Sequence, residues 1–235
     1  MTFQLWTSLF QGPLDIVGFV LFVLVFPLYH AFYPWLIRRF PNRVAKARFD
    51  LYRRSWIEGL LERRDIVAAA QQTRNLTMVN SILASSTLIL MGFSANLLLR
   101  SGELDREIPH PRIWDVHPDA LAGKLFLLIL VFAVAFGYCM TSLRHLGHFN
   151  LVIGADPAVI EELEGSSVDY FSTLINRSSN RHTLAVRCLY SASPIFLWMF
   201  DPLFFIVLTL FWGTKFIGFQ DFVHVLGRVR PADSA

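Results

Sequence analysis

The sequence predicts an all-α protein, a membrane-embedded bundle of four transmembrane helices with amphipathic helices on its cytoplasmic side. Three observations lead to this fold class. Of the 235 residues, 54% are hydrophobic and 22 are phenylalanine, which is more apolar surface than a soluble domain of this length readily buries. These apolar residues gather in four long blocks. The basic residues are concentrated between the blocks rather than within them.

Each block is long enough to cross a membrane, because about 20 mostly apolar residues span the hydrocarbon core as a helix. We place the spans at 14–37, 77–99, 121–146 and 186–219. Together with the connecting segments 38–76 and 147–185 they form a single membrane domain, 1–220, followed by a tail, 221–235. The first block contains Asp15, has no basic segment before it and no small-residue cleavage site after it, so we expect it to remain as a span.

The basic residues predict the orientation. Ten Lys and Arg residues lie from Arg38 to Arg74, whereas none precedes Arg38. Because positively charged loops stay on the cytoplasmic side, we expect the N-terminus outside and the 38–76 segment inside. We therefore expect the protein in the inner (plasma) membrane of a bacterium.

The cytoplasmic segments are expected to be partly helical. Apolar residues recur at helical spacing in the first segment, at Phe49, Tyr52, Trp56 and Leu60. With arginines around them, they predict a basic amphipathic helix that lies on the membrane surface or packs beneath the bundle. In the second segment, Asp156-Pro157 predicts the start of a short helix.

The fourth block is too long for one straight span. Its 34 residues, 186–219, would extend about 50 Å as a helix, against about 30 Å of hydrocarbon. The prolines at Pro194 and Pro202 are the candidates for a helix kink, and Asp201-Pro202 either kinks the span or splits it into a hairpin. We prefer the kinked span, because a tight turn at membrane depth leaves backbone groups without partners. Lys215 and the basic tail favour the hairpin.

Polar residues within the blocks have two interpretations each. Asp201 is either a turn residue at the outer interface, which we prefer, or a mid-membrane acid paired with His30, Asn80 or Asn96. The second block is rich in small polar residues, which favour close helix packing or, as the alternative, line a polar pathway. These residues are Asn80, Ser81, Ser85, Ser86, Thr87, Ser94 and Asn96.

Ionisable residues at the span ends are the main candidates for function, because burying them is costly. The candidate binding residues, all expected near the cytoplasmic face, are Arg74, Asn75, Arg144, His145, His148 and Arg187. They mark the membrane border, contact an anionic lipid or ligand, or handle protons. We expect Arg74, Arg144 and His148 to share one side-chain network.

Other classes of site find little support. No Cys, Asp or Glu completes a metal site with His145 and His148, and no phosphate-binding loop, nucleophile elbow or HExxH motif is present. We therefore expect no enzyme activity, no cofactor and no metal. The net charge is +3, and the basic residues lie where the predicted topology would place them. Because no base-reading or stacking motif accompanies them, we expect no nucleic-acid binding. Cys139 and Cys188 lie in or beside apolar blocks and predict no disulfide framework.

Three stretches of the chain resemble one family. They are QTRNLTMVNSILASSTLIL, CMTSLRHLGHFNLVIG and VRCLYSASPIFLWMFDPLFF. Together they are similar to the membrane family of bacteria and plants catalogued as domain of unknown function 599, from the first span to about Phe219. The resemblance implies a multi-span membrane fold without an assigned activity, and glycine is common in that family where this chain has Asp201. It singles out Arg74, Asn75, Ser81, Arg144, His148, Arg187, Pro194, Trp198 and Pro202.

The function that these features predict is non-enzymatic. Polar residues at the cytoplasmic ends of the helices would bind or pass an anion or a lipid headgroup. The alternative is a structural or accessory subunit whose apolar helices pack against another membrane protein or a second copy of the chain. The wholly apolar stretch 125–137 weakens the permeation interpretation. The expected partners are membrane lipids and another membrane protein or a second copy, with no nucleic acid among them.

Overall fold

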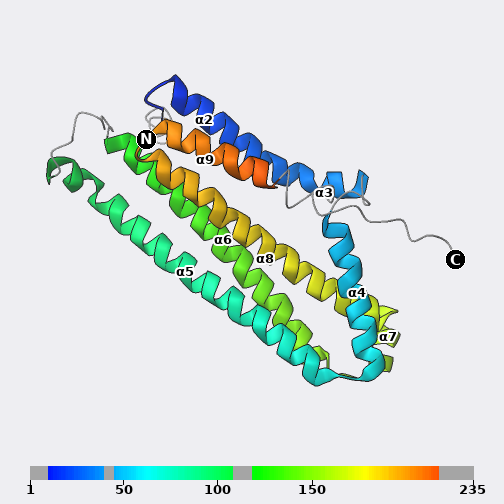
Figure 1. The fold of residues 1–235 in the computed structure, drawn as a ribbon. Helices are drawn as coiled ribbons and strands as arrows, with labels where there is room; N and C mark the ends of the chain where they lie inside the picture. Colours follow the sequence, from blue (N-terminus) through cyan, green and yellow to red (C-terminus); the bar gives the residue numbers. More distant parts are fainter. Residues whose placement is uncertain (1–9, 40–44, 108–117, 217–235) are drawn as a thin grey trace.

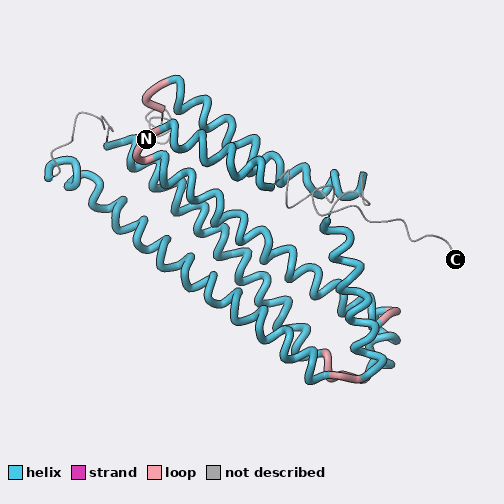
Figure 2. The backbone as a smooth tube through the Cα atoms, viewed as in Figure 1, coloured by secondary structure: helices cyan, strands magenta, loops and turns pink. Residues whose placement is uncertain are grey.

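A computed structural model of the chain describes residues 10–39, 45–107 and 118–216, and within these ranges every regular element is a helix (Figures 1 and 2). This confirms the all-α fold class. Three helices are long and apolar enough to cross a membrane by length and composition, at Pro13–Tyr33, Ile66–Arg100 and Ala120–Val152, and Pro202–Lys215 is a shorter apolar helix. The predicted tail, 221–235, lies outside the described residues.

The first span is a rod made of three consecutive segments. Helix α2 (Pro13–Val23) runs into a π-helical turn, η1 (Leu24–Leu28), and then into α3 (Tyr29–Arg39). Pro27 lies inside η1 and has no backbone N–H to donate, which accounts for the local change of helical pitch. The rod therefore begins close to the predicted start at 14 and carries its irregularity at its middle.

The centre of the bundle consists of three long helices side by side: α5 (Ile66–Glu107), α6 (Pro118–Val152) and α8 (Ser167–Trp198) (Figure 1). Helix α6 packs against both of the others. Residues far apart on α6 and α8 pair in reverse order, since Lys124 Nζ contacts Trp198 and the Ser142 hydroxyl contacts Ser178. The two helices are therefore antiparallel over most of their length.

The fourth predicted span is a hairpin. Helix α8 ends at Trp198, and α9 (Pro202–Lys215) returns along it, so Trp198 stacks on Phe205 and Trp212 Nε1 donates to Ser193 Oγ at 3.0 Å. Our preference for one kinked span is thus wrong. The turn of the hairpin lies at one end of the bundle, level with Lys124.

Local hydrogen bonds stabilise this turn. The backbone N–H groups of Met199, Phe200 and Asp201 donate to carbonyls of the last turn of α8. The Asp201 carboxylate accepts from the N–H of Leu203 at 2.6 Å and caps α9, with Pro202 at its first position. Asp201 is therefore a turn residue, as preferred from the sequence. Pro194 lies inside α8, which continues past it.

Two small residues bring α2 and α9 together. A Cβ on Gly18 would lie 2.7 Å from Phe205 Cδ1, and a Cβ on Gly213 would lie 3.2 Å from Val25 Cγ2. Close approach through glycine is a common way for membrane helices to pack. The two helices run in the same direction, because Gly18 pairs with Phe205 and Val25 with Gly213.

The two ends of the bundle differ. At the turn end lie Asp15, Lys124 and the 199–201 turn. At the opposite end, which we call the basic end, α4 (Ala45–Arg63) crosses α8 and the short α7 (Pro157–Glu164) follows α6, as Figure 1 shows. Asp156 caps α7 through the N–H of Ala158 at 3.0 Å, which confirms the helix start predicted at Asp156-Pro157.

Helix α4 packs beneath the bundle with part of its predicted apolar face. Leu60 is buried, together with Ile57, in a cluster that includes Phe149 and Phe171. The apolar stripe predicted from the sequence was only partly right, because Phe49 and Tyr52 are exposed. These two aromatic residues lie on a flank of α4 that the described part of the chain leaves uncovered.

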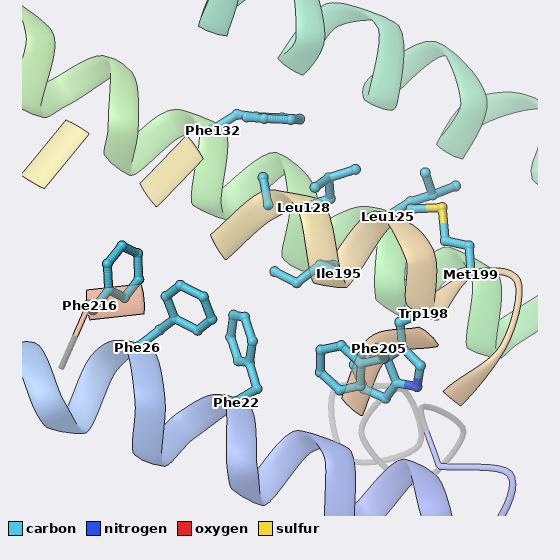
Figure 3. Close-up of a cluster of buried hydrophobic side chains, with 11 residues drawn as sticks. Phe22, Phe26, Leu125, Leu128, Phe132, Ile195, Trp198, Met199, Phe205 and Phe216 are labelled. Carbon is cyan, nitrogen blue, oxygen red and sulfur yellow. The ribbon is translucent and has the colours of Figure 1, made fainter. Parts of the chain in front are cut away.

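A second cluster runs from Trp198 at the turn end to Phe216, directly after α9. This aromatic core joins α2, η1, α6, α8 and α9, and in Figure 3 the rings of Trp198 and Phe205 lie against each other. Its main members are Phe22, Phe26, Leu128, Trp198, Phe205 and Phe216.

Candidate functional site

The predicted cytoplasmic network is not formed. The side chains of Arg74, Arg144 and His148 are all exposed, and within the described part of the chain no hydrogen bond or ion pair joins them. Helix geometry explains this. The residues that contact across α5 and α6 are Thr73 and Asn150, which hydrogen bond to each other, and Arg74 is turned away from that contact by one residue, about 100° of helix. Asn75 is exposed as well.

A different set of basic side chains lies where α6 packs against α8. Arg144, Arg177, Arg181 and His148 all lie close enough to His145 to act on it electrostatically. Arg177 and Arg181 were not among the predicted site residues, because they belong to the connecting segment 147–185 and not to an apolar block. Only the packing of α8 against α6 brings Arg177 and Arg181 close to His145.

Arg187 lies away from that group, deeper along α8. It is nine residues beyond Ser178, whose hydroxyl contacts the Ser142 hydroxyl at 2.9 Å, and nine residues correspond to about 14 Å of helix. Its side chain is buried, with 6% exposure. The expectation that Arg187 lies at the same face as Arg74 and Arg144 is therefore wrong.

Arg187 lines a cavity of about 520 Å³ between the first span, α6 and α8, which we call the Arg187 cavity. Its volume falls in the usual range of small-molecule sites. The apolar wall consists of Phe22, Phe26, Pro27, Ala31, Leu127, Leu130, Val131, Val134 and Leu184. The remaining lining residues are His30, Tyr138, Arg187, Cys188 and Ser191. Val131 and Val134 place the cavity halfway along the apolar block 121–146.

Aromatic rings hold the Arg187 guanidinium. Its Cζ lies 5.1 Å from the ring centroid of Tyr33 and 5.3 Å from that of Phe216, within the range of cation–π attraction. The His30 ring lies edge-on to Phe216, and its Nδ1 donates to the carbonyl of Phe26 at 2.5 Å. These contacts fix the Arg187 guanidinium on α8 and the His30 ring on α3, and both side chains line the Arg187 cavity.

Polar contacts elsewhere in the bundle serve helix packing. His182 Nδ1 donates to Asn80 Oδ1 at 3.1 Å, which links α8 to the buried Asn80 of α5. The hydroxyls of Thr87 and Ser94 donate to carbonyls of their own helix. The alternative in which Asp201 is a mid-membrane acid paired with His30, Asn80 or Asn96 is not what the structure shows, since the Asp201 carboxylate caps α9.

The turn end contains a buried ion pair that was not predicted from the sequence. Lys124 Nζ lies 3.8 Å from Asp15 Oδ1, and both side chains are 3% exposed. The Asp15 carboxylate also accepts from Trp198 Nε1 and from the N–H groups of Gln11 and Gly12. Lys124 Nζ donates to the Trp198 carbonyl at 3.0 Å and lies over its indole ring. The sequence feature that could have indicated this pair is one Asp and one Lys near the starts of two separate apolar blocks.

Comparison with protein families decides the classification. The family model described as "Protein of unknown function, DUF599" matches residues 17–223. The chain belongs to the DUF599 family. No curated protein and no solved structure matches it.

For this DUF599 protein, the match confirms the resemblance seen in the three sequence stretches. Together with three helices able to cross a membrane, it identifies the chain as a membrane protein. The family supplies no ligand. Within the three described ranges, no group of three His, Cys, Asp or Glu side chains is placed to hold a metal ion.

Proposed function

We propose that the protein binds an anionic amphiphile in the Arg187 cavity, with the acyl chain against the apolar wall and the anionic head at Arg187. The observation that carries this proposal is a buried guanidinium lining an apolar cavity in a membrane protein. Ionisable residues at membrane depth are costly and are retained mainly for function. The planar guanidinium suits a carboxylate or a phosphate, to which it donates two parallel hydrogen bonds.

The size of the cavity favours a ligand with one acyl chain. Its volume of about 520 Å³ lies in the middle of the usual range for small-molecule sites, of about 300–1,000 Å³. A single acyl chain with its head group is a ligand of that size class.

Binding is favoured over permeation because the route stops at the turn end. Toward the Asp15–Lys124 pair, the rings of Trp198 and Phe205 stack on each other and Phe22, which lines the cavity, packs on Phe205. A permeation pathway needs polar groups along its whole length. These apolar rings between the cavity and the turn end support binding over permeation.

We propose binding without catalysis. The hydroxyl of Ser191, which lines the cavity, donates to the carbonyl of Cys188 at 2.7 Å and is committed to its own helix. The accessory-subunit interpretation stays as the alternative that failure of ligand binding would favour.

Cys188 reports on the occupancy of the cavity that it lines. In a Cys139→Ser background, with the full chain in phosphatidylcholine nanodiscs, we expect palmitate or hexadecyl phosphate to slow the alkylation of Cys188 by N-ethylmaleimide, and hexadecanol to slow it far less. The reason is that only the first two carry the charge that Arg187 recognises. Arg187→Gln should weaken protection by the anions by about tenfold or more, the effect of losing a charged hydrogen bond.

Controls separate charge recognition from damage to the fold. Arg187→Lys keeps the charge and should keep part of the preference for the anion over the alcohol. Arg177 is an exposed arginine of the same helix. In the Arg177→Gln variant the two anions should protect Cys188 as well as they do in the parent. Equal protection of the parent by palmitate, hexadecyl phosphate and hexadecanol, or none by any of them, would overturn the proposed function. A preference for one anion over the other identifies a carboxylate or a phosphate as the natural head group.

We further propose that the turn end faces outward and the basic end inward, in the inner (plasma) membrane of a bacterium. This follows from the ten basic residues between Arg38 and Arg74. In a cysteine-free background expressed in bacteria, a membrane-impermeant maleimide should label Phe200→Cys in sealed cells and Lys46→Cys only after permeabilisation. External labelling of Lys46→Cys, or equal labelling of both, would contradict this orientation.

A further inference from the structure

One face of α8 connects the membrane border to the interior of the cavity. Arg181, Leu184 and Cys188 follow one another at spacings of three and four residues and so lie on a single helix face, and Leu184 and Cys188 line the Arg187 cavity. Arg181 is exposed, whereas Arg187 is 6% exposed. Six residues separate them, or about 9 Å of helix. This face thus begins with an arginine at the surface and ends at Cys188, the neighbour in sequence of the buried Arg187.

Tyr138 joins the surface arginine to the cavity. It is a lining residue of the Arg187 cavity, and the Arg181 guanidinium lies over its ring, 5.6 Å from the centroid. This contact holds the charge of Arg181 at the edge of the cavity instead of letting the side chain extend freely into solvent. None of the other residues that act on His145 is stacked on a cavity wall in the described part of the chain.

The surroundings of Arg181 are positively charged. Arg144, Arg177 and Arg181 each lie close enough to His145 to act on it electrostatically, where α6 packs against α8. Positively charged residues there raise the local concentration of anionic head groups in the adjacent membrane surface. An amphiphile whose chain lies in that leaflet presents its head at the same depth.

We infer that Arg181, held over Tyr138, is the capture residue through which a single-chain anionic amphiphile passes from the adjacent leaflet to Arg187. This inference rests on the proposed function of the cavity. The two arginines then act at different steps. Arg181 at the rim accelerates association, because rim charges act mainly on the encounter. Arg187 inside the cavity slows dissociation, because buried charge pairs act mainly on the lifetime of the complex.

The test is a stopped-flow measurement with parinaric acid, a single-chain carboxylic acid whose fluorescence rises through energy transfer from protein tryptophans. The full chain is reconstituted in phosphatidylcholine nanodiscs. For Arg181→Gln we expect the association rate constant to fall about tenfold and to lose most of its dependence on salt, with dissociation within about twofold of the parent. For Arg187→Gln we expect dissociation to be at least about tenfold faster, with association little changed.

Matched variants locate the effect at the cavity edge. Arg177→Gln removes the same charge one turn earlier on α8 and should slow association by less than about twofold. Arg181→Lys retains the charge and should restore most of the rate. Because Arg181 is exposed, its replacement leaves the packed core intact.

The outcomes separate the two claims. If Arg187→Gln binds as the parent does, the proposed function fails and the inference fails with it. If Arg187→Gln dissociates faster but Arg181→Gln associates as fast as the parent, the proposed function stands and Arg181 is not the capture residue. If Arg177→Gln slows association as much as Arg181→Gln, general surface charge accounts for the rate, and the specific role of Arg181 is overturned.

Discussion

Replacing Lys124 by methionine is expected to lower the free energy of unfolding by about 3–5 kcal/mol, the usual cost of leaving one charge of a buried ion pair without its partner. Methionine fits the volume of the lysine stem, so lost packing contributes little. What remains is the Asp15 carboxylate, 3% exposed on its side chain, without the ammonium group that lies 3.8 Å from it. The loss is measured by unfolding in detergent micelles followed by tryptophan fluorescence.

The pairing itself is tested by a double-substitution cycle. Asp15→Asn alone should also destabilise, since it leaves the Lys124 ammonium buried. The double variant Asp15→Asn/Lys124→Met should be clearly more stable than the sum of the two single effects predicts, because it removes both charges together. Glu58→Gln is the control, because Glu58 pairs with Arg54 on the exposed surface of α4, where such pairs contribute at most about 1 kcal/mol. Strictly additive single effects would show that the two charges are not coupled.

The fold class and the first three spans could be predicted from the sequence because they depend on local composition. A helix of about 20 apolar residues is recognisable wherever it lies, and each of the three candidate spans overlaps one predicted block. The bounds were less accurate, because the second span begins at Ile66 and not at 77, and the third continues to Val152 and not to 146. The hairpin between α8 and α9 was only an alternative. Its turn is permitted because Lys124 and the N-terminus of α2 lie beside it, and such non-local neighbours leave no trace in the local pattern.

The candidate site was harder to predict, because the position of each ionisable residue along the bundle was inferred from the limits of the apolar blocks. Arg187 opens the apolar block 186–219 and therefore looked like a border residue. In the fold, α8 begins at Ser167, well before that block, and this shifts Arg187 inward. The rings of Tyr33 and Phe216 surround its guanidinium. Hydropathy does not show when aromatic rings from distant segments stabilise a buried charge.

Chemical identity was a better guide than position. Arg144 lies near His145 and Arg187 lines a cavity, although Arg144 does not join the network expected for it. Pro202 begins α9 directly after the turn that was an alternative from the sequence. The sequence could not show that Arg177 and Arg181 join Arg144 at His145, because that arrangement depends on the register between α6 and α8. The contacts of Ser142 with Ser178 and of Lys124 with Trp198 record that register.

Replacing Trp198 by alanine is expected to cost about 3–5 kcal/mol of unfolding free energy, as for other fully buried large side chains. Trp198 is 0% exposed and its ring lies parallel to that of Phe205, with centroids 4.5 Å apart. The Phe205 ring is also in close contact with Gly18 of α2, so movement of that ring into the void would disturb the contact between α2 and α9. Loss of the indole also removes one donor to Asp15.

Trp198→Phe separates the ring from its N–H group. It keeps an aromatic ring on Phe205 and loses the hydrogen bond to Asp15, so we expect an intermediate cost of about 1–3 kcal/mol. Trp35→Ala is the matched control, because Trp35 is 61% exposed and its removal creates no internal cavity, so a change within about 0.5 kcal/mol is expected. Thermal and chemical unfolding in one detergent compare the three variants with the parent. A Trp198→Ala variant as stable as Trp35→Ala would show that the aromatic core does not hold the α8–α9 hairpin against α2, and that the Asp15–Lys124 pair fixes the turn end by itself.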